Sequence, residues 1–104
     1  MSHAIHRLEA SNCFDLSNHA STRSQQRGVR PSTIRLVLDY HDQCWRAKGG
    51  RHAIRISKQY VNRLPNFGIP RSTAERARGI VLIVSFRSRT VVTVTHGDRR
   101  RVWR

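Results

Sequence analysis

The sequence is poor in acidic residues and in cysteine. Only six of its 104 residues are Asp or Glu, and none of them falls in the close spacing of a two-metal site. Two cysteines, Cys13 and Cys44, do not make a disulfide framework. The six histidines occur in no HxxxH or HExxH pattern, and CxxC is also missing. We therefore expect reduced thiols, no metal ion and no cofactor.

Long apolar runs are missing as well. The longest, Ile80–Val84, is far below the roughly 20 residues that a membrane-spanning helix needs. The first residues carry charge and contain no apolar segment of the kind that marks a secretory signal. We therefore expect a cytoplasmic protein that does not use a membrane as a partner.

Positive charge is the dominant feature that the sequence does have. Lys and Arg number 20, which gives a formal net charge of +14 with neutral histidines. A chain of this length forms one domain with one core. A surface this basic repels itself unless it meets a polyanion. Nucleic acid is the first expectation for the partner, and an acidic protein is the second.

The first part of the chain predicts two helices. Ser17 is a favourable N-cap residue and Gly28 suits the left-handed end of a helix, so one helix is expected from Ser17 to about Arg27. Pro31 suits the first turn of a second helix that ends near Tyr40. Its apolar residues recur at helical spacing at Ile34, Val37 and Leu38. The first helix is polar on almost every side, so we expect it to be exposed at an edge of the domain.

The second part of the chain predicts strands. Residues 51–57 and 90–96 alternate between apolar and polar side chains, whereas residues 80–86 are almost all apolar. In the last strand the alternation places Val92 and Val94 on one face and Val91, Thr93 and Thr95 on the other. The turn at 87–89 predicts an antiparallel hairpin, and residues 65–79 are expected to be a long loop with a brief helix. The fold class is therefore α+β, with two N-terminal helices packed on a small antiparallel sheet.

The stretch from Ser17 to Val29 reads S-x-H-A-x-x-R-x-x-x-R-G-V, and it is followed by PSTI and later by HAIRIS. This pattern resembles the DUF4258 family of small bacterial proteins over about residues 17–96. That family is thought to be related to the barnase–EndoU–colicin–RelE group of nucleases and toxins. The resemblance implies a small RelE-like ribonuclease fold. It divides a single domain, residues 1–104, into an arm (1–16), the family-like core (17–96) and a basic tail (97–104).

One row of side chains on the first helix suits RNA cleavage. His19, Arg23 and Arg27 recur at intervals of four residues and so share one face. Cleavage without a metal ion needs a group that titrates near neutral pH and cations that stabilise the phosphate. Histidine and arginine meet these needs. We expect His19 and Arg23 to be catalytic, with His96 as a second acid–base candidate. The alternative is that these residues form an ordinary solvated helix face.

Further residues are expected to bind the nucleic acid. Arginines and threonines on the strands and at the turn suit a phosphate backbone, and the tail joins basic residues to an aromatic ring that can stack on a base. These residues are Arg27, Arg55, Arg87, Arg89, Thr93, Thr95, Arg99, Arg100, Arg101 and Trp103. For each strand residue the alternative is an ordinary solvent-facing position. Tyr60 is another stacking candidate, although packing in the core is the favoured interpretation.

These observations predict a toxin-like, metal-independent ribonuclease that acts on RNA phosphodiesters, alone or neutralised by an acidic antitoxin or immunity protein. Two alternatives remain open. One is a non-catalytic nucleic-acid-binding protein, which shares the charge and lacks the chemistry. The other is a basic interaction protein that docks an acidic protein partner and has little affinity for nucleic acid near physiological salt.

Overall fold

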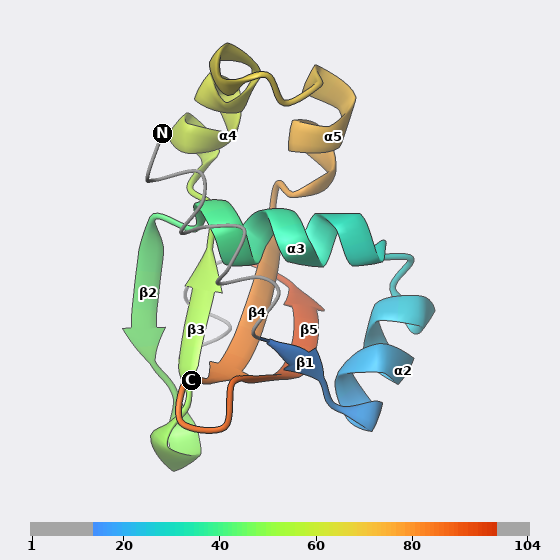
Figure 1. Ribbon diagram of the computed structural model, residues 1–104, viewed down its shortest axis with the longest axis vertical. Coiled ribbons are helices and arrows are strands. Elements are labelled where there is room, and N and C mark those ends of the chain that lie inside the picture. The colour runs from blue at the N-terminus through green and yellow to red at the C-terminus, as the bar shows by residue number, and fades with distance from the viewer. Residues whose placement is uncertain (1–13, 98–104) are drawn as a thin grey trace.

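The computed structural model describes residues 14–97, and within this range helices and strands are mixed along the chain (Figure 1). Four helices are described: α2 (Asn18–Gln26), α3 (Pro31–Tyr40), α4 (Lys58–Arg63) and α5 (Arg71–Arg76). Five strands form one sheet: β1 (Asp15–Leu16), β2 (Gln43–Arg46), β3 (His52–Arg55), β4 (Ile80–Ser85) and β5 (Thr90–His96). Two 3-10 turns, η1 (Lys48–Gly50) and η2 (Leu64–Phe67), complete the described elements. The expected α+β class is confirmed.

The sheet is mixed rather than wholly antiparallel. Its strand order is β1-β5-β4-β3-β2, and the neighbours from β2 to β5 are antiparallel. The short strand β1 pairs in parallel with β5, with Leu16 opposite Val91. Only two residues make this pairing, which is too short for a recognisable alternation of side chains. The expectation of an antiparallel sheet was therefore wrong at this edge, where the predicted arm contributes a strand.

The caps of the first two described helices agree with the sequence. The Ser17 hydroxyl accepts a hydrogen bond from the Ala20 N–H at 3.0 Å and donates one to the Val92 carbonyl at 3.0 Å. Gly28 adopts a φ of +67°, a conformation that glycine takes without strain. Pro31 begins α3 at a position that needs no N–H donor. Ser17 thus both caps α2 and fastens its start to β5.

Helix α2 is less exposed than its polar sequence indicates. Ala20 and Ser24 are buried against the sheet, and α2 packs chiefly on β5. The Ser24 hydroxyl donates a hydrogen bond of 2.8 Å to the Ser21 carbonyl, so its burial leaves no unsatisfied donor. Because these buried side chains are small, the helix approaches the strand without an apolar stripe. The prediction of an exposed edge helix was wrong for this face.

Helix α3 crosses one face of the sheet (Figure 1) and supplies most of the helical contribution to the core. Val37 is fully buried, and Ile54 of β3 and Leu82 of β4 are fully buried in the same apolar cluster. Beyond one end of the sheet, α4, η2 and α5 pack together as a small helical unit (Figure 1). Residues 65–79 were expected to be a long loop with a brief helix. The brief helix is α5, and most of the rest is also ordered by η2, with Leu64 and Ala74 buried in the core.

A β-bulge changes which valines of β5 face the core. Ile83 pairs with Thr93, but the next residue, Val84, pairs with Val91, so Val92 is an extra residue in β5. Val91 and Val94 are 1 % and 0 % exposed and belong to the core, whereas Val92 is only half-buried. The prediction that Val91 shares a face with Thr93 and Thr95 was therefore wrong: the bulge shifts the alternation by one residue and places Val91 on the core face with Val94.

Candidate functional site

A pocket of about 230 Å³ opens where three strand ends meet. Strand β3 ends at Arg55, β4 begins at Ile80 and β5 ends opposite it at His96. Because β3 and β5 are each antiparallel to β4, their carboxyl ends lie at the same edge of the sheet. The pocket is lined by Arg55, Ile56, Lys58, Gly79, His96 and Gly97. Two residues predicted for separate roles, Arg55 and His96, are thus brought into one site.

The Arg55 side chain is held by two residues of β2. Its Nε donates a hydrogen bond of 2.6 Å to the side-chain oxygen of Gln43, its partner across the two strands. The guanidinium carbon lies 5.4 Å from the centroid of the Trp45 ring, a cation–π distance. Among the described residues, Arg55 makes this hydrogen bond through Nε alone, so both of its terminal amino groups are available to an anion. Such a planar fork matches two oxygens of a phosphate.

Lys58 adds a second cation to this pocket. It is the first residue of α4 and is exposed. Its place is fixed by Ser57, the N-cap of α4, whose Oγ accepts a hydrogen bond of 3.2 Å from the Tyr60 N–H. Lys58 was not predicted from the sequence as a site residue. The available signal was Ser57, a favourable N-cap residue at the end of a predicted strand. An N-cap there places the first residue of the helix, Lys58, beside the end of the strand.

His96 brings an imidazole to the same pocket. It is exposed, and the Thr95 hydroxyl donates a hydrogen bond of 3.2 Å to the His96 carbonyl. An imidazole exchanges protons near neutral pH, and two neighbouring cations suit a phosphate whose charge increases during reaction. The pocket therefore unites a proton-transfer group with an anion-binding pair. It has the components that phosphodiester chemistry needs.

Thr93 and Thr95 lie on the face of the sheet that also carries Trp45. The cross-strand partners run from Thr93 to Ile83, then to Ala53 and Trp45. Arg55 follows Ala53 by two residues and so shares this face. One face of the sheet therefore carries Arg55 and both threonines. Ser57 lies beyond the end of β3, where it is buried as the N-cap of α4.

The histidine and arginines of the first helix occupy another part of the fold. His19 and Arg23 lie one turn apart on α2, and His19 is exposed. Arg23 is half-buried, and its Nε has no hydrogen-bond partner among the described residues. Arg27 is exposed and caps the end of α2 rather than extending its face. None of these three residues lines the pocket with His96.

Arg87 and Arg89 lie at the opposite end of the sheet from His96. Both are exposed in the turn between β4 and β5. Strand β5 separates them from His96 by about 20 Å, at roughly 3.3 Å per residue. The predicted phosphate-binding set is therefore divided between two ends of the sheet. Arg99, Arg100, Arg101 and Trp103 lie outside the described residues.

Tyr60 lies in α4, within the helical unit, and does not line the pocket with His96. Its ring meets that of Phe67 edge-on at a centroid distance of 6.0 Å, and it packs against the core. It also lines a different pocket, of about 280 Å³, with Asp42, Ser57, Gln59 and Arg63. The packing interpretation of Tyr60 is confirmed.

Comparison with protein-family models, with curated proteins and with solved structures finds no match to this chain. Within residues 14–97, no three His, Cys, Asp or Glu side chains gather in a way that could hold a metal ion. Among the helices of the same described range, none is long and apolar enough to cross a membrane. The geometry of the pocket is therefore the basis for an argument about function.

Proposed function

We propose that this protein is a metal-independent ribonuclease whose active site is the pocket formed by Arg55, Lys58 and His96. The observation that carries the proposal is the convergence of an imidazole and two cations from three different elements at one sheet edge. Arg55 and Lys58 bind the phosphate of an RNA chain, and His96 is the group that transfers a proton. The net charge of +14 supports RNA as the substrate, because long-range attraction accelerates and strengthens its binding.

The reaction follows from the groups in the pocket. Neutral His96 takes the proton of a ribose 2′-hydroxyl, whose oxygen then attacks the adjacent phosphorus. The bond from phosphorus to the 5′-oxygen breaks, which leaves a 2′,3′-cyclic phosphate. The 5′-oxygen takes a proton from water, and the hydroxide so formed removes the proton that His96 had taken, which restores neutral His96. Arg55 and Lys58 stabilise the negative charge that accumulates on the phosphate oxygens. DNA lacks the 2′-hydroxyl, so this mechanism predicts cleavage of RNA alone.

The proposal extends to a toxin-like role and to a protein partner that neutralises the ribonuclease. The resemblance of residues 17–96 to the DUF4258 family supports a toxin-like ribonuclease in the cytoplasm. An acidic antitoxin or immunity protein would neutralise it by covering the same basic surface, since acidic side chains compete with phosphate for arginine. His19 and Arg23 on α2 are the second candidate for the catalytic group, as their residue types indicate.

The test compares His96→Ala and His19→Ala with the parent protein. A short RNA carrying one fluorophore is incubated with each protein in excess EDTA, and cleavage is followed by gel electrophoresis. We expect His96→Ala to lower the rate by about 10²- to 10⁴-fold, the range for loss of a general acid or base, while the affinity for RNA is kept. Arg35→Gln, at an exposed position of α3, is the control for loss of one charge elsewhere.

The other outcomes have definite meanings. If His19→Ala alone abolishes cleavage, catalysis belongs to α2 and the pocket is not the active site. If the parent protein binds RNA but does not cleave it in EDTA, the ribonuclease proposal is wrong and the non-catalytic binding alternative replaces it. The pair of cations, Arg55 and Lys58, supports that alternative too, because it can bind a phosphate without cleaving the RNA. Negligible affinity for RNA near physiological salt would instead favour an acidic protein partner.

A further inference from the structure

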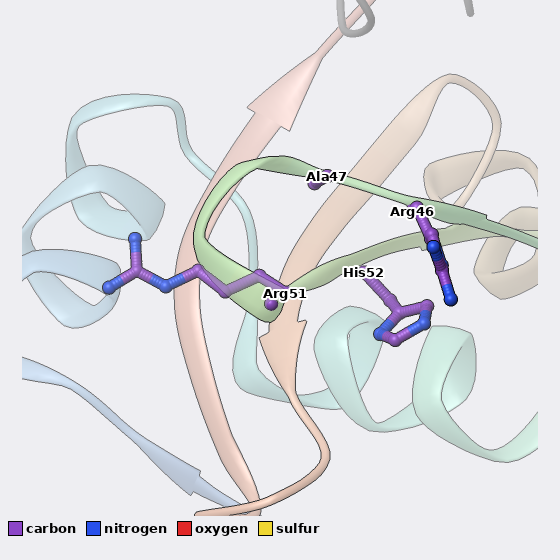
Figure 2. A pocket seen from close by; sticks show the side chains of 5 residues that line it. Arg46, Ala47, Arg51 and His52 are labelled. Atoms are coloured by element: carbon purple, nitrogen blue, oxygen red, sulfur yellow. The ribbon is translucent and has the colours of Figure 1, made fainter.

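A third pocket lies at the opposite end of the sheet from His96, beside the hairpin that joins β2 and β3. It has a volume of about 380 Å³ and is lined by Arg46, Ala47, Gly50, Arg51 and His52 (Figure 2). Gly49 and Gly50 both have positive φ angles, +72° and +73°, so the hairpin turns tightly at residues that take this conformation without strain. The two arginines and the histidine are therefore held on a short, sharply turned segment.

Arg46 and His52 are direct partners across β2 and β3, so their side chains emerge on the same face of the sheet. Figure 2 shows the His52 ring beside the Arg46 side chain, while the Arg51 side chain extends away from the hairpin in the other direction. Arg46 and Arg51 are both exposed. Among residues 14–97, no acidic side chain lines this pocket, so no carboxylate of the described chain neutralises its two guanidinium groups there.

An aromatic row borders the pocket. The rings of His52 and Phe86 have their centroids 5.1 Å apart and are tilted by 58°. Phe86 also meets Phe14 edge-on, at 6.0 Å and 81°. Phe86 is nevertheless 42 % exposed, although the rings of His52 and Phe14 both contact it. A large apolar ring is thus kept at the surface, and the exposed Arg87 follows it directly in the chain.

Rigid aromatic rings among cations are the components with which proteins bind single-stranded nucleic acid, because every base has a face that can stack. We propose that Phe86 and His52 form a stacking site for one unpaired base of single-stranded RNA, and that Arg46 and Arg51 bind the phosphates beside that base. The inference rests on the proposed RNA binding and deepens it. Strand β5, about 20 Å long, separates this site from the His96 pocket. A dinucleotide is therefore too short to occupy the stacking site and the His96 pocket together, and only a longer RNA can reach both.

The test measures the affinity of the full chain for two RNA-like oligomers of eight units, one of adenosine and one with the same backbone but no bases. We expect Phe86→Ala to weaken binding of the adenosine oligomer about tenfold, as loss of one stacked base predicts, and to leave the abasic oligomer unaffected. Phe86→Trp keeps a flat ring and should restore the affinity. Phe67→Ala is the matched control, because Phe67 is another exposed phenylalanine, 56 % accessible, on the helical unit.

Substitution of Arg46 or Arg51 should change binding in a different way from substitution of Phe86. Arg46→Gln and Arg51→Gln should weaken both oligomers and should each lower the slope of log affinity against log salt by about one. The stacking site is wrong if Phe86→Ala binds the adenosine oligomer as tightly as the parent, or if it weakens both oligomers equally. These results are independent of the His96→Ala cleavage assay. If Phe86→Ala shows the stacking effect but the parent protein does not cleave RNA, the stacking site stands and the ribonuclease proposal is wrong. If the parent cleaves RNA but Phe86→Ala has no effect on binding, the ribonuclease proposal stands and the stacking site is wrong.

Discussion

Arg55 and Gln43 face each other across β3 and β2, and Nε of Arg55 donates a hydrogen bond of 2.6 Å to the side-chain oxygen of Gln43. Trp45, two residues further along β2, holds the same guanidinium through its ring. The arginine is therefore oriented before any ligand binds, which lowers the entropy that binding has to overcome. The proposed phosphate site thus depends on a strand that lines no part of its pocket.

The first prediction tests this orientation. Gln43→Ala removes the hydrogen bond but leaves the charge of Arg55, so we expect the affinity for a short RNA to fall severalfold, by about 1 kcal/mol. Arg55→Lys should bind more weakly than the parent as well, because an ammonium group lacks the planar fork. Fluorescence anisotropy measures both affinities. An unchanged affinity in Gln43→Ala would show that Gln43 does not position Arg55 for the ligand.

The second prediction concerns the connection between Asp42 and Ser57. The Asp42 carboxylate accepts hydrogen bonds from the Ser57 N–H at 2.7 Å and from its hydroxyl at 2.6 Å. Asp42→Ala should lower the free energy of unfolding by about 2 kcal/mol, since hydrogen bonds to a charged group contribute more than neutral ones. Urea unfolding measures this, and the double variant with Ser57→Ala gives the coupling. Additive effects of the two substitutions would contradict a direct interaction.

The third prediction separates the two valines at the bulge. Val91 is buried in the core, so Val91→Ala should lower the free energy of unfolding by about 2 kcal/mol through lost apolar contact and a small cavity. Val92 is the extra, half-buried residue, so Val92→Ala should cost less than about 1 kcal/mol. Chemical denaturation of both variants compares them. Equal costs, or the reverse order, would mean that β5 alternates regularly without a bulge.

The fourth prediction concerns pH. The Glu75 carboxylate accepts hydrogen bonds from Arg78 at 3.0 and 3.2 Å. This hydrogen bonding, opposed by desolvation and assisted by the charges of Arg78 and Arg71, lowers the pKa of Glu75. Since the folded pKa lies below the unfolded value of about 4.3, the contact stabilises the fold above that pH and its contribution is lost as the pH falls through the folded pKa.

Glu75→Gln should therefore lower the melting temperature at pH 7, and the difference from the parent should shrink as the pH is lowered to 3. Both side chains of the pair are substantially exposed, so the effect is small and decreases with added salt. Thermal unfolding at low and high salt at each pH measures it. A difference that stays constant down to pH 3 would show that the charge of Glu75 is not its source.

Sequence patterns were sufficient where local chemistry decides the structure. The span of α3 follows from Pro31 and three apolar residues at helical spacing, and the capping of α2 follows from Ser17 and Gly28. The apolar run that forms β4 and the alternating residues of β5 predicted their hairpin. Each of these signals lies within a few residues of the structure that it determines.

Other features depend on residues far apart in the chain. The parallel pairing of β1 and the burial of α2 are set by β5, which lies more than 60 residues further on. The bulge depends on how β5 matches β4, and a single extra residue reverses a prediction based on alternation. Pairing between strands has no local signature when the strands are this short.

The sequence by itself determined the excess of positive charge, the α+β class and the kinds of side chain available for binding an anion. The sequence did not determine which of these side chains lie together in the fold. Arg55 and His96 come together with Lys58 because β3 and β5 are both antiparallel to β4, and Arg87 and Arg89 are carried to the far end by the same arrangement. Charge is a property of composition, whereas a site requires that distant segments converge, and only the tertiary structure decides that.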